Sequence, residues 1–194
     1  MKKIVIIIMC LLTMGSTIFA YDLSVGFGAA YGIVNDHWEF TDSLDFLIDD
    51  FNRNQYGAFA FFGTRYSEFN FSVRLSMNNW TNSEGESGVD STLMLNVGAY
   101  GKIPIPLGSN FVVFPTIGID FDAVEDLMYL WAKGGIGLDI FFTERFFLRA
   151  QGLYGYGIAP FFLLEKALGK YDGDYMKVTP GHGPFFKLGL GWMF

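Results

Sequence analysis

The feature that most constrains the fold is a two-residue alternation that recurs along most of the chain. Between residues 69 and 78, every odd-numbered side chain is apolar and every even-numbered one is Asn, Ser or Arg. A period of two places successive side chains on opposite faces of a β-strand. After the first 20 residues, no apolar run approaches the ~20 residues that a membrane-spanning helix needs.

Eight segments carry a strand-like pattern, and the connections between them alternate in length. The short connections are 66–68, 104–110 and 143–145, and the long ones are 35–54, 79–90, 122–130 and 159–184. Outer-membrane barrels have short turns on the periplasmic side and long loops outside. The predicted strands are Asp22–Val34, Gln55–Arg65, Phe69–Asn78, Ser91–Ile103, Phe111–Phe121, Trp131–Phe141, Phe146–Ile158 and Phe185–Phe194. In Gln55–Arg65 the facing is ambiguous, because Phe59, Phe61 and Phe62 cannot all point outward.

The first 20 residues have the pattern of a secretory signal peptide. Lys2 and Lys3 precede an apolar run from Ile4 to Leu12, and small or polar residues follow up to Ala20. That apolar run is too short to span a bilayer as a helix. We therefore expect cleavage after Ala20, which leaves 194 − 20 = 174 residues as one domain, 21–194.

The composition narrows the class of protein further. The chain has 22 Phe, 10 Tyr and 24 Gly, and its mean hydropathy is +0.30. An exported, apolar chain without membrane-spanning helices can satisfy its backbone hydrogen bonds in a membrane by forming a closed β-barrel. A soluble β-sandwich would also alternate, but here the polar faces are rich in glycine with isolated charges, which suits a narrow lumen. The mature charge of 11 − 20 = −9, without a basic cluster, argues against binding to nucleic acid.

The isolated charges on the inward faces form the first candidate site. If Phe142 faces Phe146 across the turn 143–145, Asp139 lies directly opposite Arg149. Unlike charges that oppose each other in a low-dielectric interior are expected to pair. Two interpretations remain: the pair fills the interior of a narrow barrel, or it acts as a plug or gate. The residues assigned to this lumenal network are Asp139, Arg149, Lys102, Arg74, Asp120, Lys133 and Lys187.

Apolar clusters on the predicted outer loops form the second candidate site. Segment 42–51 has apolar side chains at helical spacing, and segments 122–131 and 160–169 also carry several. Exposed apolar clusters on outer loops suggest a binding surface for lipid or a small apolar ligand. Alternatively, the segments pack on each other or extend the strands. The candidate binding residues are Leu44, Leu47, Ile48, Phe51, Leu127, Met128, Phe161, Phe162, Leu164 and Leu168.

Catalysis is the weakest of the alternatives. The two histidines, His37 and His182, are predicted on outer loops, and no G-x-S-x-G nucleophile motif is present. We assign no catalytic residue, metal ligand or cofactor, and expect the protein not to be an enzyme. A lipid-modifying barrel enzyme remains a third alternative.

The segment GGIGLDIFFTERFFLRAQGLYGY, residues 134–156, and the terminal LGLGWMF resemble small outer-membrane barrels of the OmpA, OmpX and OmpW kind. The resemblance implies an eight-stranded antiparallel up-and-down barrel. It also implies that Trp192 and Phe194 form a signal for the barrel-assembly machinery. OmpW-like barrels, the favoured relatives, are thought to pass small hydrophobic molecules sideways into the membrane.

The resulting expectation is an all-β, monomeric protein in the outer membrane of a diderm bacterium. It would contact membrane lipid and bind or pass small hydrophobic molecules through apolar outer loops and a narrow or gated lumen. The alternative is a structural or surface-interaction, adhesin-like barrel with a closed lumen.

Overall fold

The computed structural model describes residues 22–40, 48–81, 85–124, 127–160 and 176–194. For the described residues that fall within 36–51, 124–128 and 159–180, only the backbone is described. The expected signal peptide, 1–20, lies outside the described residues. No helix in the described residues is long and apolar enough to span a membrane.

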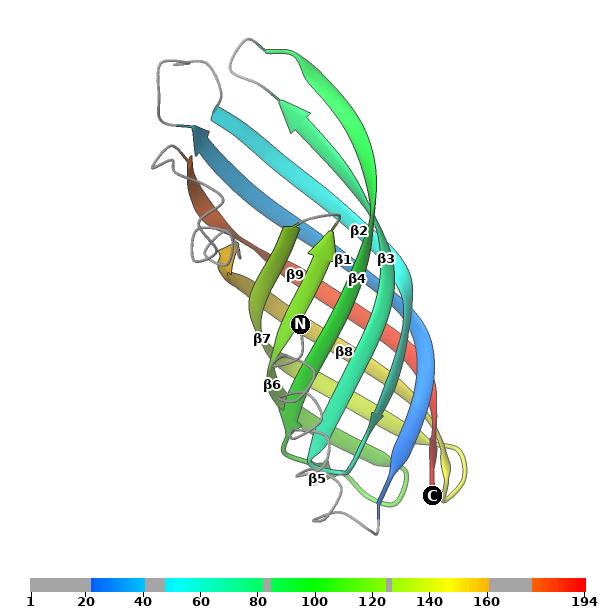
Figure 1. Cartoon of the computed structure of the whole chain (residues 1–194). Coiled ribbons are helices and arrows are strands. Elements are labelled where there is room, and N and C mark those ends of the chain that lie inside the picture. Colours follow the sequence, from blue (N-terminus) through cyan, green and yellow to red (C-terminus); the bar gives the residue numbers. More distant parts are fainter. Residues whose placement is uncertain (1–21, 41–47, 82–84, 125–126, 161–175) are drawn as a thin grey trace, which may run out of the picture.

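The described residues form nine antiparallel strands that close into a barrel (Figure 1). The order is β4-β3-β2-β1-β9-β8-β7-β6-β5, and an additional β4–β6 pairing closes the sheet. Strand β5 is a two-residue segment in the turn between β4 and β6, so eight strands of the described chain build the wall. The prediction of an eight-stranded antiparallel barrel is therefore confirmed. The strands are β1 Ser24–Phe40, β2 Ile48–Gly63, β3 Ser67–Thr81, β4 Ser87–Lys102, β5 Ile105–Pro106, β6 Phe111–Val124, β7 Leu127–Phe141, β8 Phe146–Pro160 and β9 Met176–Met193.

The last strand closes the barrel against the first. Ser24 pairs with Met193, and the backbone N–H of Phe194 donates to the Leu23 carbonyl at 2.9 Å. The beginning of β1 and the end of β9 lie at the same end of the barrel, together with the short turns (Figure 1). In one of these turns the Thr143 hydroxyl accepts a 2.9 Å bond from the Phe146 N–H, which helps the four residues 142–145 to reverse the chain.

At the opposite end the strands are longer than predicted, and the assignment of 35–54, 79–90, 122–130 and 159–184 to loops was wrong in large part. Strand β1 continues to Phe40, β2 begins at Ile48, and β9 begins at Met176. The register Glu39↔Ile48 and Phe40↔Met176 shows that antiparallel pairing continues there. Backbone pairing needs no apolar alternation once the strand has left the membrane, so the side-chain pattern ends before the strand does.

The barrel wall has unequal height around its circumference. Strand β4 pairs with β6 only from Leu95↔Ala123 to Lys102↔Thr116, and its upper part, Ser87–Met94, rises beyond the last paired residue of β6. The β8–β9 ladder likewise ends at Tyr156↔His182. In Figure 1, β1 to β4 reach well above the end of the β6–β7 hairpin. A tall wall of β9, β1, β2, β3 and β4 therefore faces a short wall of β6, β7 and β8.

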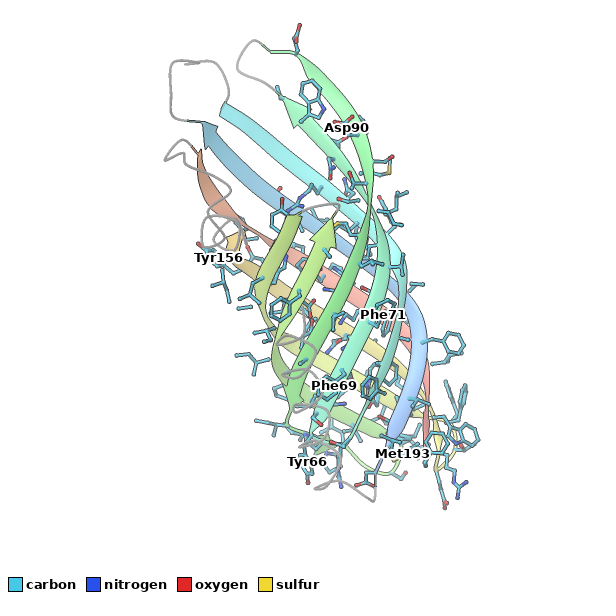
Figure 2. The ribbon with its side chains drawn as sticks, viewed as in Figure 1. Tyr66, Phe69, Phe71, Asp90, Tyr156 and Met193 are labelled. Atoms are coloured by element: carbon cyan, nitrogen blue, oxygen red, sulfur yellow. The ribbon has the colours of Figure 1, made fainter. Side chains whose placement is uncertain are left out.

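Apolar side chains cover the outer surface of the barrel. Phe71 and Tyr156 project outward, with 50% and 53% of their surface exposed (Figure 2). In β2, Phe62 points outward, whereas Phe59 and Phe61 are buried in the lumen, which resolves the ambiguous facing. Wide exposure of large apolar side chains suits a surface whose solvent is lipid.

Pro115 lies in β6 where the neighbouring ladder is interrupted. The β4–β6 register ends at Thr116 and the β5–β6 register starts at Val113. The Pro115 carbonyl accepts a 3.1 Å bond from the Ile103 N–H. Proline has no N–H to return that bond, so a break in the ladder is where a strand tolerates it.

Candidate functional site

The lumen of the barrel contains all seven charged residues assigned to it from the sequence. Each is at most 6% exposed in the described structure, although the barrel ends open to solvent. Inward placement follows from strand parity, because side chains two residues apart share a face. These residues are Arg74, Lys102, Asp120, Lys133, Asp139, Arg149 and Lys187.

Near the short turns, four charged side chains form the lower cluster: Glu68, Lys102, Asp139 and Arg149. Asp139 is the register partner of Arg149, as the sequence predicts, and accepts bonds from its Nε at 2.7 Å and Nη2 at 2.6 Å. Arg149 Nη1 also bonds Glu68 Oε2, and Lys102 Nζ donates to the same oxygen at 3.0 Å. The two acids and two bases balance, so every charge in this cluster has a partner.

Sequence reasoning missed Glu68, which joins Lys102 and Arg149 across the lumen. The prediction placed it in the turn 66–68, but β3 begins at Ser67. Glu68 shares parity with Asn70, whose amide nitrogen donates to Glu68 Oε1 at 2.8 Å. Extending the inward face of β3 by two residues would have identified it.

Farther from the turns, Asp120 is the centre of the upper cluster. Its Oδ2 accepts from Lys133 Nζ at 2.6 Å and lies 3.9 Å from Arg74 Nη2, while its Oδ1 accepts from the Tyr100 hydroxyl at 2.5 Å. Arg74 is held by further hydrogen bonds from its guanidinium group, of 3.0 Å to Ser72, 3.2 Å to Gln55 and 3.1 Å to Asn96.

Asn96 extends this network by donating to Asp122 Oδ1 at 2.5 Å. Sequence reasoning missed Gln55, Asn96, Tyr100 and Asp122. The sequence does contain a signal for them, because their positions in the strand alternation place each side chain on the inward face.

Glycines leave the space that these bulky charged groups occupy. A Cβ on Gly98 would lie 1.9 Å from Asp120 Oδ1, and one on Gly137 would lie 2.2 Å from the Phe114 ring. The glycine-rich inward faces are therefore filled by side chains from neighbouring strands, as expected for a narrow barrel.

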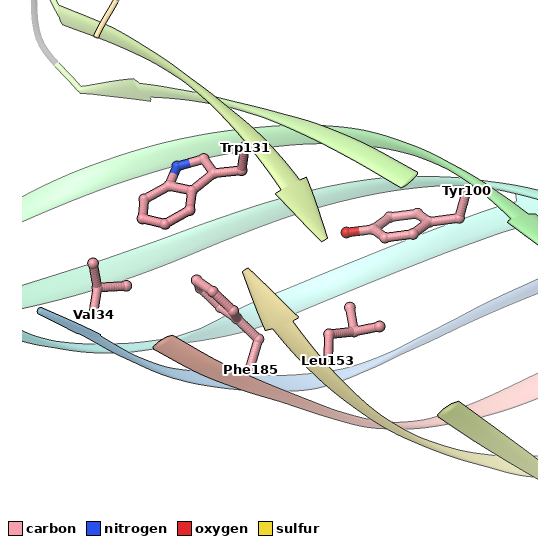
Figure 3. Packing of buried hydrophobic residues seen from close by; sticks show 5 residues of the cluster. All are labelled: Val34, Tyr100, Trp131, Leu153 and Phe185. Atoms are coloured by element: carbon pink, nitrogen blue, oxygen red, sulfur yellow. The ribbon is translucent and has the colours of Figure 1, made fainter. Parts of the chain in front are cut away.

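Aromatic rings fill much of the remaining lumen. The Arg149 guanidinium lies 4.5 Å from the centroid of Phe61, 5.0 Å from Phe147 and 5.1 Å from Phe114. Above them, Val34, Tyr100, Trp131, Leu153 and Phe185 form the lumenal apolar cluster (Figure 3). Rings and ion pairs therefore occupy much of the middle of the described lumen.

At the turn end, a cavity of about 560 Å³ opens below the lower cluster. Lys102, Asp139 and Arg149 line it on the lumen side, with Phe114 and Phe141 beside them. Its outer rim includes Asp22, Arg65 and Glu144. This turn-end cavity was not predicted, because its walls come from three different turns and from the ends of several strands.

The outer wall also carries an apolar depression of about 1000 Å³, lined by side chains from β1, β2, β6, β7, β8 and β9. Tyr56, Ile136, Phe186 and Leu188 line it, and each is about half exposed. Because these side chains point away from the lumen, membrane lipid is the natural filling of this depression.

The second predicted site falls mainly outside the described part of the chain. Leu44, Leu47, Phe161, Phe162, Leu164 and Leu168 lie outside the described residues. The backbone of Ile48 and Phe51 belongs to β2, and that of Leu127 and Met128 to β7. The helical spacing expected for 42–51 is therefore wrong from Ile48 onward, since that part pairs with β1 as a strand.

Both histidines lie on strands, which corrects their predicted loop positions. His37 belongs to β1 and His182 to β9. His182 Nδ1 lies 2.7 Å from the Tyr154 hydroxyl on the exposed outer face. Among the described residues, no cluster of three or more His, Cys, Asp or Glu could hold a metal ion.

The two residues of the predicted assembly signal sit at the turn end of β9. Trp192 and Phe194 point outward and are 43% and 66% exposed. Trp192 packs against Phe146, with ring centroids 6.4 Å apart. Exposed rings at the end of a barrel suit an interfacial aromatic girdle.

A closed eight-stranded antiparallel wall, an apolar outer face and a charged, filled lumen define a small outer-membrane β-barrel. Two solved structures of outer-membrane or surface proteins are similar to this chain. The outer membrane protein OprG from Pseudomonas aeruginosa has a TM-score of 0.54 at 11% identity, covering 91% of this chain and 97% of that one. Neisserial surface protein A has a TM-score of 0.50 at 13% identity, covering 89% and 97%. No protein-family model and no curated protein sequence matches the chain.

Proposed function

We propose that the protein binds small hydrophobic molecules at the tall end of the barrel and passes them sideways toward the membrane. In this proposal the protein is an OmpW-like, monomeric outer-membrane barrel, exported through the signal peptide 1–20. The lumenal clusters act as a plug, so that nothing crosses along the barrel axis.

The observation that carries this proposal is the unequal wall height. Among the described residues, Ser87–Met94 of β4 has no partner strand on its β6 side. At about 3.4 Å per residue, these eight residues extend roughly 27 Å along the strand beyond the last β4–β6 pair. Val89 and Leu93 in this stretch are each 61% exposed. A break in the wall bordered by apolar side chains offers a lateral path between the outside and the lipid.

The filled lumen supports the same proposal from the other direction. Asp120 and Lys133 are buried and hydrogen-bonded between neighbouring strands, and Arg149 is bonded to Glu68 across the barrel. An eight-stranded barrel is usually filled by its own side chains, and here that filling is charged and aromatic. A hydrophobic solute would have to desolvate these ion pairs to travel down the axis, so a sideways path costs less free energy.

The test is uptake of a hydrophobic fluorophore by cells that carry the barrel in an intact outer membrane. Leu93→Gln places an amide on the unpaired edge of β4. The control, Leu75→Gln, places the same amide on β3 at the register partner of Leu93, where strands β2 and β4 pair on both sides. We expect the protein to accelerate uptake, and Leu93→Gln to slow uptake much more than Leu75→Gln does. Equal uptake with and without the protein, at equal amounts of folded barrel, would refute the proposal.

The surface-interaction alternative draws on the same tall wall. In the projecting β3–β4 hairpin, the indole N–H of Trp80 donates to Asp90 Oδ2 at 3.1 Å. This bond stiffens a polar projection that could meet an external partner. Loss of surface adhesion on deletion of residues 79–90, together with unchanged fluorophore uptake, would favour this alternative.

A further inference from the structure

Lys187 is a buried lumenal cation without a hydrogen-bond partner. Its side chain lies between the two charged clusters and is 4% exposed, and its Nζ forms no hydrogen bond with any described residue. The Nζ lies 4.6 Å from the centroid of Tyr100 and 5.7 Å from that of Phe59. Aromatic faces stabilise a cation only in part, so the three donors of the ammonium group remain unsatisfied.

Gln151 is the register partner of Lys187 on β8, and its side chain is equally unsatisfied. It is 4% exposed, and within the described part of the chain neither its amide oxygen nor its amide nitrogen has a hydrogen-bond partner. The next residues along the same row are Ala30 on β1 and Gly137 on β7, which bring no polar side chain. Two orphaned polar groups that face the same lumen from paired positions point to a missing ligand.

The charge balance of the lumen identifies the sign of that ligand. Arg53 has an interaction of its own. Apart from it, the buried cations of the described lumen number five and the carboxylates four, which leaves one positive charge in excess. The lower cluster is balanced internally, and Asp120 and Asp122 lie with Lys133 and Arg74 in the upper cluster. The cations are Arg74, Lys102, Lys133, Arg149 and Lys187, and the carboxylates are Glu68, Asp120, Asp122 and Asp139.

We propose that Lys187 and Gln151 bind a small monovalent anion, of the size and charge of chloride, between the two clusters. Lys187 supplies the compensating charge and N–H donors, and the Gln151 amide nitrogen supplies another donor. A buried unpaired charge is costly, and an anion removes that cost where a neutral water molecule would leave the excess charge in place.

The turn-end cavity approaches this site from below the lower cluster and is lined by cations. Arg65 stands at its rim, and Lys102 and Arg149 face it from the lumen. Gln151 follows Arg149 by two residues on β8, so its side chain is the next one inward on the same face. An anion entering from the turn end therefore meets Lys102 and Arg149 before it reaches Lys187. The site is independent of the sideways path proposed for hydrophobic molecules.

Bromide is a direct probe, because its anomalous scattering locates it in crystals of the refolded protein. We expect one bromide peak in contact with Lys187 Nζ and the Gln151 amide in the unaltered protein. The peak should be absent in Lys187→Met and weakened in Gln151→Leu, and it should persist in Arg145→Met, which removes an exposed cation at a turn. A water molecule at this position, or no density at all in crystals grown in bromide, would overturn the proposal.

A solution measurement separates loss of the site from loss of the fold. The urea concentration at the unfolding midpoint of the unaltered protein in detergent should rise with chloride or bromide concentration. The ionic strength is kept constant with the salt of an anion that is too large to enter the lumen. Arg145→Met should keep this dependence, and Lys187→Met should lose it. Lys187→Met should also have the higher midpoint in halide-free buffer, because it lacks the unpaired charge. A midpoint independent of halide in the unaltered protein would refute the site.

Discussion

Arg149 and Asp139 face each other across β7 and β8 and form a two-point ion pair, with Nε–Oδ1 at 2.7 Å and Nη2–Oδ2 at 2.6 Å. This geometry uses the planar fork of the guanidinium group and leaves Nη1 directed at Glu68 on β3. One arginine thus connects strands that are far apart in the sequence, and the lower part of the barrel is held closed by side chains as well as by its backbone.

Glu68→Gln should destabilise the barrel strongly. The substitution removes the carboxylate that Arg149 and Lys102 share, and it leaves excess positive charge in a buried cluster. Breaking a buried ion pair by removal of one partner typically costs about 3–5 kcal/mol. Urea unfolding in detergent micelles, followed by tryptophan fluorescence, measures the change. The matched control is Glu144→Gln at an exposed turn, where no measurable loss is expected; equal midpoints for both variants would contradict the assignment.

The Asp139–Arg149 pair should show strong coupling in a double-mutant cycle. Asp139→Asn and Arg149→Met each leave a buried charge without one of its partners, whereas the double variant removes both charges together. The combined loss of stability should therefore be smaller than the sum of the single losses, with a coupling energy of about 0.5–3 kcal/mol. Additive losses would mean that the two side chains stabilise the barrel independently.

Gly98→Ala tests whether glycine makes room for Asp120. The new methyl group would lie 1.9 Å from Asp120 Oδ1, so the upper cluster must shift. Overpacking of this kind costs about 1–3 kcal/mol. Gly101→Ala on the same strand is the control, because the nearest atom to its new methyl group is 3.9 Å away. A Gly98→Ala variant as stable as Gly101→Ala would show that the lumen is more loosely packed than described.

Removal of Phe194 should impair assembly in the membrane more than refolding in detergent. The residue adds one backbone hydrogen bond, to Leu23, and an outward ring, so its structural contribution is modest. Its proposed role as a signal for the assembly machinery predicts a large loss of folded barrel in cells, measured by heat-modifiable mobility in gels. Phe142→Ala, which alters another exposed ring at the same end, should assemble normally. Equal loss in both assays would indicate a structural role alone.

Much of this fold could be predicted because strand parity is a local property. The alternation around Arg74 or Lys187 fixes which face each side chain takes, whatever the neighbouring strands are. The Asp139–Arg149 register followed from a tight turn, Thr143–Arg145, that leaves few alternatives.

The rest depended on relationships that no local pattern contains. Glu68 was missed because a turn was assigned where a strand already begins, and the length of β9 was missed because pairing outside the membrane needs no alternation. Glu68 and Arg149 are 81 residues apart in the sequence, and their ion pair can form only when the barrel has closed. Likewise, only the assembled lumen reveals that Lys187 has no hydrogen-bond partner.

Planar-bilayer conductance of the refolded, unaltered protein tests most directly whether the two charged clusters block the lumen. We expect no steady conductance above the bare membrane, and none after Asp139→Ala, because the upper cluster and the aromatic layers around Phe59 and Phe147 remain. A stable open channel in the unaltered protein would show that the clusters do not block the lumen.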